Sequence, residues 1–319
     1  MSQTPEILWQ PSQEQIERTR LHDYMRWLAR HKGLEFADYH ALWEWSVHSL
    51  EAFWESIWQY FDVQAAVSYE RVLDGYDMPG AKWFEGSRLN LASQLFRFHA
   101  EEPERPAIIA RSELRLLTTL SWGELKRQVS QLAQALRRLG VQPGDRVVAY
   151  LPNLPETVVA FFACASIGAI WSSCSPDMGT RSVVDRFRQI DPKVLIAVDG
   201  YRYGGKDFDR RGVVEQLRAE LPTLQHVVLL PYLDPAARLP GAHLWTDLLQ
   251  GEAEIVIEQL PFDHPLWVVY SSGTTGLPKP IVHGHGGVLL ETLKGHALHM
   301  DLGPDDRFMW FTTTGWIMW

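Results

Sequence analysis

The run Val268-Val-Tyr-Ser-Ser-Gly-Thr-Thr-Gly-Leu-Pro-Lys279 tells most about the fold of this chain. It continues the apolar segment Leu266–Tyr270, which has the composition of a buried strand, and the segment after it is compatible with a helix. Its hydroxyl groups offer hydrogen-bond donors, its glycines let backbone N–H groups approach an anion, and Lys279 adds a positive charge. The run therefore predicts a polyphosphate-binding loop that follows a strand of an α/β sheet.

Other kinds of loop fit this run less well. A Walker A loop needs a glycine directly before its lysine, but Pro278 stands before Lys279. A dinucleotide fingerprint needs G-x-G-x-x-G at a strand-to-helix turn of a βαβ unit, and the sequence has none there. Short Ser/Thr/Gly stretches are often plain surface loops. The length and composition of the whole run favour the phosphate loop over that alternative.

The sequence around the run indicates an α/β protein. From Ala107 onward, short β-branched segments alternate with amphipathic helices, which is typical of βαβ units in a mostly parallel sheet. A capping box at Ser121 and Glu124 begins one helix, Gly140 ends it, and Pro155 begins an apolar helix that continues into a strand. The other predicted strands are Arg146–Leu151, Val194–Val198, His226–Leu230 and Leu266–Tyr270.

Residues 1 to about 85 differ in composition and carry seven of the fourteen tryptophans. Two or three helices are predicted, the first with a capping box at Ser12 and Gln15. Phe53, Ile57 and Phe61 form a stripe at helical spacing beside Trp54 and Trp58. Such stripes are usually core, so we expect this face to pack on a neighbour, in preference to an aromatic ligand site.

Composition and charge exclude several classes of protein. With 46% hydrophobic and 22% charged residues, the chain is of the globular type, and a formal charge of −9 argues against a sequence-independent nucleic-acid binder. The start shows no secretory signal, and the longest apolar stretch is too short for a bilayer span. Cys164 and Cys174 lack metal or redox spacing and are expected to be buried thiols. We therefore expect a cytoplasmic protein without a membrane partner.

The loop Ser271–Lys279 resembles the phosphate-binding signature of the adenylate-forming superfamily, which includes acyl-CoA synthetases, luciferases and peptide-synthetase adenylation domains. The resemblance implies that the loop grips the β- and γ-phosphates of ATP, with Mg²⁺ sharing the charge, while a substrate carboxylate attacks the α-phosphorus. Lys279 and Thr275 are the implied catalytic residues. A glycine usually follows the lysine, and here Pro280 stands in its place. The implied phosphate-binding residues are Ser271, Ser272, Gly273, Thr274, Thr275, Gly276 and Lys279.

Further stretches narrow the resemblance. Lys82–Asn90 and the helical region before it are similar to the N-terminal domain that acetyl- and acetoacetyl-CoA synthetases share. Ala165–Asp177, Asp199–Tyr203 and Thr312–Trp319 resemble acetoacetyl-CoA synthetases more than acetyl-CoA synthetases. The implied domains are a helical region of residues 1–100 and the first part of an AMP-binding domain of residues 101–319, with the C-terminal domain absent.

The same resemblance implies two more groups of site residues. Trp316, Ile317 and Met318 would form the short-chain acyl pocket, with His283 near the nucleotide or the acyl group. Arg202, with Lys206 nearby, would contact the phosphates of CoA, although both are equally suited to a solvated surface.

A zinc site is not expected, although several histidines follow the loop. His283 and His285 are close in sequence, but no carboxylate or Cys stands with them at ligand spacing. Gly284, Gly286 and Gly287 favour a mobile loop around them. We therefore expect no metal ligands here.

These implications make the full-length protein a ligase that joins acetoacetate to CoA with ATP, through acetoacetyl-AMP. The alternatives are an acetyl- or propionyl-CoA synthetase, and a non-catalytic module that binds nucleotide or CoA. Family members are roughly twice as long as this chain, so we expect the 319 residues alone to be inactive and to expose an apolar face around Phe311 and Trp316. The sequence does not predict an oligomeric state.

Overall fold

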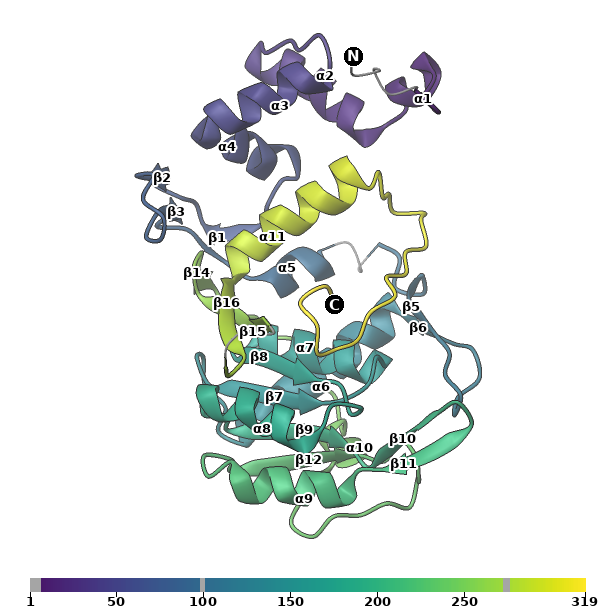
Figure 1. Ribbon diagram of the computed structural model, residues 1–319. Helices are drawn as coiled ribbons and strands as arrows, with labels where there is room; N and C mark the ends of the chain where they lie inside the picture. The colour runs from purple at the N-terminus through teal and green to yellow at the C-terminus, as the bar shows by residue number, and fades with distance from the viewer. Residues whose placement is uncertain (1–6, 98–100, 272–275) are drawn as a thin grey trace. The chain divides into compact units, whose positions relative to one another are not determined.

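The computed structural model describes residues 7–97, 101–271 and 276–319. The chain divides into two compact units (Figure 1). Unit 1 comprises Met1–Val63, Arg71–Glu85 and Val288–Met309, and unit 2 comprises Gln64–Glu70, Gly86–Gly287 and Trp310–Trp319.

Helices dominate unit 1. Four helices lie in the described part of its first segment, whereas two or three were predicted. Ser49 leaves the helical conformation, with φ −120° and ψ 58°, and so separates α3 from α4. The predicted capping box at Ser12 and Gln15 is confirmed. The elements are α1 (Gln13–Glu17), α2 (Arg20–Lys32), α3 (Tyr39–His48), α4 (Leu50–Tyr60), the hairpin of β2 (Arg71–Asp74) and β3 (Lys82–Glu85), and a π-helix (Lys294–His299).

The aromatic face of α4 packs on the β2–β3 hairpin. Trp58 stacks on Phe84 with ring centroids 4.7 Å apart, and Trp54 meets Trp83 edge-on at 6.2 Å. Deeper in this core, the hydroxyl groups of Tyr24 and Ser56 are 2.5 Å apart. The expected packing role of the stripe is confirmed.

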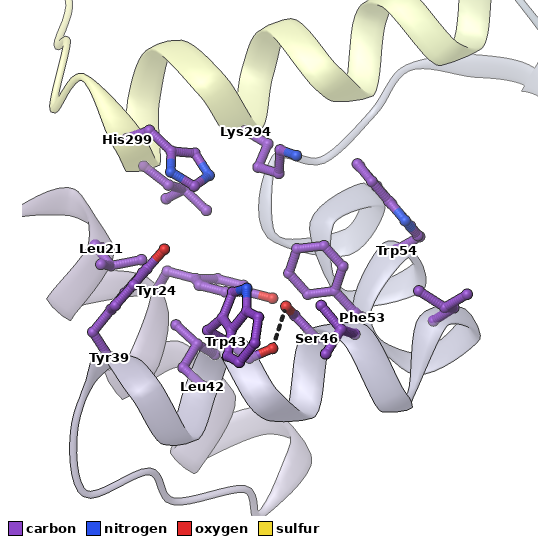
Figure 2. A pocket seen from close by; sticks show the side chains of 13 residues that line it. Leu21, Tyr24, Tyr39, Leu42, Trp43, Ser46, Phe53, Trp54, Lys294 and His299 are labelled. Atoms are coloured by element: carbon purple, nitrogen blue, oxygen red, sulfur yellow. Dashed lines mark hydrogen bonds between the residues drawn. The ribbon is translucent and has the colours of Figure 1, made fainter.

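A hollow of about 380 Å³ remains in unit 1 (Figure 2). Its wall is mostly apolar and aromatic, and it includes Trp43 and Phe53. The ammonium group of Lys294 lies 4.9 Å from the centroid of the Trp54 ring, and it also pairs with Glu291 at 2.9 Å. The one ammonium group in the wall therefore already has a carboxylate partner.

Unit 2 is built on a seven-stranded sheet with the order β13-β12-β9-β7-β8-β15-β16. All neighbours are parallel except β15 and β16, which are antiparallel. The mostly parallel α/β fold is thereby confirmed. The strands are β7 (Arg146–Tyr150), β8 (Ile170–Cys174), β9 (Val194–Val198), β12 (His226–Leu230), β13 (His243–Leu244), β15 (Pro265–Ser271) and β16 (Lys279–Gly284).

Helices cover both faces of the sheet. Val148 and Tyr150 of β7 share one buried core with α8 (Thr180–Phe187) and α9 (Arg211–Glu220). Successive strand residues point to opposite faces, so the buried Val147 and Ala149 face the other side, where α6 (Trp122–Arg138) and α7 (Pro155–Ser166) lie (Figure 1). The helix predicted at Pro155 and the helix end at Gly140, whose φ is 80°, are both confirmed.

Smaller elements complete unit 2. A three-stranded sheet has the order β1-β4-β14, and two antiparallel hairpins are formed by β5 with β6 and by β10 with β11. Cys164 and Cys174 are buried and free, as expected. The bounds are β1 (Ala65–Val67), β4 (Arg88–Leu89), α5 (Leu91–Phe96), β5 (Pro106–Ala110), β6 (Thr118–Ser121), β10 (Gly200–Tyr203), β11 (Lys206–Asp209), α10 (Trp245–Leu248) and β14 (Leu260–Pro261). Helix α11 (His285–Leu293) begins in unit 2, and its residues from Val288 onward belong to unit 1.

One prediction about the sequence after the phosphate loop was wrong. The loop is followed by strand β16, and helix α11 begins only at His285. The glycines expected in a mobile loop therefore lie in regular structure, Gly284 in β16 and Gly286 and Gly287 in α11. Ile281 and Val282 favour a strand, and Pro280 is tolerated because β16 is at the edge of the sheet.

Candidate active site

The connections of the large sheet reverse direction at β7. The chain passes from β7 to β8 on one side of it, and then crosses to β9 on its other side. In open α/β sheets, ligands bind outside the carboxyl ends of the strands at such a switch point. The carboxyl edge of β7, β8, β9 and β15 is therefore where a site is expected on topology alone.

The phosphate loop (Ser271–Lys279) begins at this edge. Ser271 ends β15, the parallel neighbour of β8, and its backbone lies opposite Lys279 at the start of β16. Gln189 donates a hydrogen bond of 2.9 Å to the carbonyl oxygen of Pro278, which holds the returning side of the loop. Gly276 and Lys279 are exposed. The predicted residues Ser272, Gly273, Thr274 and Thr275 lie outside the described part of the chain.

The terminal segment (Thr312–Trp319) lies against the same edge (Figure 1). The buried Thr314 donates a hydrogen bond of 2.6 Å to the carbonyl oxygen of Leu151, directly after β7. Ser173 of β8 donates to the carbonyl oxygen of Thr314. Two adjacent strand ends therefore hold this segment.

The predicted acyl-pocket residues follow Thr314 and are partly open to solvent. Trp316 is 56% exposed, and Ile317 and Met318 are exposed to a similar degree. Trp319 is held more firmly, because its indole N–H donates to Asn153 at 3.1 Å and its ring lies 6.3 Å from that of Phe161 in α7. An exposed apolar surface was expected around Phe311 and Trp316. It is confirmed for this chain, in which Phe311 is 94% exposed.

His283 lies on the same face of the sheet as Phe161 and Trp319 but not beside the phosphate loop. The indole N–H of Trp267 donates to its Nδ1 at 2.8 Å, and Trp267 also contacts Phe161 at 5.7 Å. In the strand register His283 is opposite Trp267, four residues before Ser271, which is about 13 Å along the strand. Burial lowers the pKa of His283, so its ring is neutral at pH 7, with the proton on Nε2.

The surroundings of His285 indicate a structural role rather than a binding role. It is fully buried at the start of α11, and its Nδ1 accepts a hydrogen bond of 3.3 Å from the backbone of Leu91. Burial, with a smaller effect from His264, lowers its pKa to about 3. Among the described residues, no cluster of three or more His, Cys, Asp or Glu side chains could hold a metal ion.

The β10–β11 hairpin also leaves the sheet at the carboxyl edge, one residue after β9 ends. Arg202 and Asp207 form a two-point ion pair across it, with Nε–Oδ1 at 2.5 Å and Nη2–Oδ2 at 3.0 Å, and this hydrogen bonding lowers the pKa of Asp207. Lys206 is exposed at the start of β11.

A carboxylate occupies the tip of this hairpin. The backbone N–H groups of Gly204 and Gly205 both donate to Glu113 at 2.8 Å, each to a different oxygen. Both glycines have positive φ, as a tight two-residue turn requires. The hairpin therefore carries cations and anion-binding N–H groups. The carboxylates of Asp207 and Glu113 already bond to Arg202 and to these N–H groups.

The structure thus brings Ser271, Lys279, Trp316 and the base of the Arg202 hairpin to one edge of one sheet, and leaves His283 further back on its face. Sequence reasoning missed Thr314, Ser173 and Glu113. Thr314 lies within Thr312–Trp319, one of the stretches that carry the resemblance, but nothing in the sequence pairs it with strand ends 141 and 163 residues away. No helix in the described part of the chain is long and apolar enough to cross a bilayer.

Comparisons with known proteins identify the family of this chain. Residues 95–319 match the family described as AMP-binding enzyme, and residues 39–95 match the acetyl-coenzyme A synthetase N-terminus. The chain is 43% identical to an acetoacetyl-coenzyme A synthetase of Rhizobium meliloti (strain 1021) and 39% identical to an acetoacetyl-CoA synthetase of Danio rerio, each match covering 98% of this chain and 48% of the relative. The chain spans about half the length of the curated relatives it matches.

A solved structure is similar over almost the whole chain. The acetoacetyl-CoA synthetase from Streptomyces lividans is 51% identical and superposes with a TM-score of 0.96, covering 99% of this chain and 49% of that one. Together with the AMP-binding match, which spans well over half of the residues, this leaves no ambiguity about the family. The chain belongs to the AMP-binding enzyme family.

Proposed function

We propose that the enzyme of which this chain forms a part ligates acetoacetate to CoA at the expense of ATP. In the first step a carboxylate oxygen of acetoacetate attacks the α-phosphorus of ATP, pyrophosphate leaves, and acetoacetyl-AMP forms. In the second step the CoA thiolate attacks the acyl carbon, and AMP leaves. The activating group comes from ATP, so no side chain of the enzyme needs to become a covalent intermediate.

The observation that carries this proposal is the meeting of three segments at the switch point of the sheet. The phosphate loop starts at the end of β15, the terminal segment with Trp316 is held on the ends of β7 and β8, and the hairpin with Arg202 follows β9. One edge of one sheet can therefore hold a polyphosphate, an acyl group and a second phosphate-bearing substrate. The names of the relatives favour acetoacetate as the acid.

Roles follow from these positions. Lys279 and Ser271, with Ser272, Gly273, Thr274, Thr275 and Gly276, would bind the ATP phosphates, and Lys279 and Thr275 would stabilise the charge that develops in the first step. Mg²⁺ would enter with its substrate as MgATP, held mainly by the phosphates, as is usual for this ion. Trp316, Ile317 and Met318 would enclose the acyl chain.

The remaining roles concern CoA and the back of the acyl site. Arg202 and Lys206 would meet the CoA phosphates. The neutral His283 would offer its Nε2–H to a polar atom of the acyl group.

We also propose the division into a helical region of residues 1–100 and an AMP-binding region of residues 101–319, and action in the cytoplasm, where ATP and CoA are available.

The proposal can be tested with an extended chain, defined as residues 1–319 followed by the part of the Streptomyces lividans protein that this chain does not match. Pyrophosphate release is measured with acetoacetate, acetate and propionate, each with and without CoA. Acetoacetate is expected to be the preferred acid. Faster turnover of acetate or propionate would favour the corresponding synthetase, and binding of MgATP without any turnover would favour a non-catalytic module.

A further inference from the structure

Arg210 lies between the β10–β11 hairpin and the ends of the neighbouring strands. Its guanidinium group is 5.2 Å from the ring centroid of Tyr201 in β10 and 5.6 Å from that of Phe208 in β11, and its Nη2 donates to the Tyr201 hydroxyl at 3.2 Å. The two rings face each other across the hairpin, 5.0 Å apart and nearly parallel. A planar cation that stacks on aromatic side chains of both strands fixes the base of the hairpin.

The same side chain reaches the loop that follows β8. Arg210 Nε donates to the carbonyl oxygen of the buried Pro176 at 2.8 Å, and the hydroxyl of Tyr150, from β7, donates to the same oxygen at 2.8 Å. Both lone pairs of that oxygen are therefore used. Burial raises the pKa of Tyr150 to about 12, so its hydroxyl stays a donor at neutral pH.

This loop, Ser175–Met178, is in turn the surface on which the terminal segment rests. A Cβ atom added to Gly315 would lie 3.0 Å from the sulfur of Met178 and 3.2 Å from the backbone nitrogen of Ser175. Gly315, directly before Trp316, is therefore packed so closely on this loop that a methyl group would fit only if a neighbour shifted by a few tenths of an ångström. A displacement of the Ser175–Met178 loop would move the terminal segment with it.

We propose that Arg210 is a positioning residue that joins the β10–β11 hairpin to the segment carrying Trp316, through the Ser175–Met178 loop. The contacts are continuous, from Tyr201 and Phe208 to Arg210, from Arg210 to Pro176, and from the loop to Gly315. A displacement of the hairpin would then also displace the segment that carries Trp316. This inference extends the proposed function, in which the hairpin meets CoA and Trp316 meets the acyl group, because it gives the two substrates a physical connection.

Amide hydrogen exchange on the 319-residue chain tests the connection without any need for activity. Arg210→Ala is expected to speed exchange about tenfold in two places, the hairpin and the terminal segment, because a charge-assisted hydrogen bond and the stacking contacts are lost. Tyr150→Phe removes a hydroxyl that bonds the carbonyl oxygens of Pro176 and Met178, both in the loop and neither in the hairpin, so it should speed exchange in the terminal segment and leave the hairpin unchanged. Arg211→Ala is the matched control, because the exposed Arg211 bonds to Asp209 and not to Pro176.

The result that would overturn the inference is an Arg210→Ala variant whose hairpin loosens while the terminal segment keeps its protection. If Arg210→Ala loses protection throughout unit 2, including α8, the milder Arg210→Lys decides, because it keeps the charge but cannot bond Pro176 and Tyr201 together. It should speed exchange in both places by a smaller factor, and unchanged exchange in the terminal segment would again overturn the inference.

Kinetics of the extended chain then separate this inference from the proposed function. Arg210→Lys should raise the KM values of both CoA and acetoacetate severalfold and leave that of ATP unchanged, whereas a general loss of folded enzyme would lower kcat alone. An inactive unmutated extended chain would count against the proposed function. An active one whose Arg210→Lys variant keeps all three KM values would count against the connection.

Discussion

Ser271 and Lys279 are cross-strand partners on β15 and β16, so the phosphate loop leaves the sheet and returns to it at one point. The Cα atoms of such partners lie roughly 4.5–5.5 Å apart. The lysine at the end of the loop is therefore brought back beside its first hydroxyl. A loop closed in this way can surround an anion with hydroxyls, backbone N–H groups and one ammonium group.

Lys279→Ala in the extended chain is expected to lower kcat/KM for ATP by at least about tenfold, because a charge-assisted contact to phosphate contributes roughly 1.5–3 kcal/mol. KM for acetoacetate should change little. Initial rates of pyrophosphate release at varied MgATP measure the effect. Lys206→Ala is the matched control, since it removes an exposed lysine of the β10–β11 hairpin and should affect CoA rather than ATP. Unchanged ATP kinetics in Lys279→Ala would refute the assignment of the loop.

Gly315→Ala should weaken the use of acetoacetate. The added methyl group would be tight against the Met178 sulfur and the Ser175 backbone, and overpacking of this kind costs about 1–3 kcal/mol, so we expect the segment with Trp316 to shift slightly. We expect kcat/KM for acetoacetate to fall about tenfold, with KM for ATP nearly unchanged. Gly212→Ala in α9, where an added Cβ meets nothing within 4 Å, is the control and should behave like the unmutated chain. Equal kinetics for the two variants would contradict the placement of the acyl group.

Glu113→Gln is expected to strengthen the use of CoA. The substitution removes a negative charge from the N–H groups of Gly204 and Gly205 and leaves a neutral amide with one acceptor oxygen. An anionic phosphate near Arg202 then meets less repulsion, and KM for CoA should fall by a factor of about three, as suits an exposed charge. Glu102→Gln, whose carboxylate pairs with Arg105, is the control. A rise in KM for CoA would mean that Glu113 supports the hairpin rather than competing with phosphate.

The fold of unit 2 could be predicted from the sequence because its core elements are locally consistent. Val194–Val198 and His226–Leu230 are short apolar runs, and the structure has them as β9 and β12 with these bounds. The capping hydroxyls of Ser12 and Ser121 likewise mark the starts of α1 and α6. Local signals of this kind do not depend on the rest of the chain.

The candidate site was harder to predict because its contacts are distant in sequence. Pro280-Ile281-Val282 pairs as a strand with the edge of β15, and the helix expected there was wrong. Thr314 and Arg210 find their partners through the order of the strands, which no local pattern contains. The roles of Trp316, Arg202 and His283 rest on resemblance and remain predictions.

His285 should make the folded chain sensitive to mild acid. Its pKa is lowered to about 3 in the folded state, whereas an unfolded histidine titrates near 6.5, so between these values the unfolded state binds the additional proton. The free energy of unfolding therefore falls as pH falls below about 6.5, by about 2 kcal/mol at pH 5 for this one group.

Denaturant unfolding at pH 7 and pH 5 measures this loss. The pKa values of His226 and His283 are also lowered by burial, so a matched variant is needed to isolate His285. His285→Gln should lose about 2 kcal/mol less than the unmutated chain between the two pH values, and His299→Gln, an exposed histidine, should lose as much as the unmutated chain. Equal losses in all three proteins would contradict the effect of burial on His285.

We propose that this chain builds a site for ATP and a short keto acid on the carboxyl edge of the sheet. The most direct test of this proposal is the initial rate of pyrophosphate release by the extended chain, with acetoacetate, acetate, propionate and butyrate compared at equal concentrations of MgATP and CoA. We expect the highest kcat/KM for acetoacetate and slower use of its neighbours, since a misfit of one methylene contributes only about 1–3 kcal/mol. Equal or faster turnover of acetate, in a chain that is folded and binds MgATP, would contradict it.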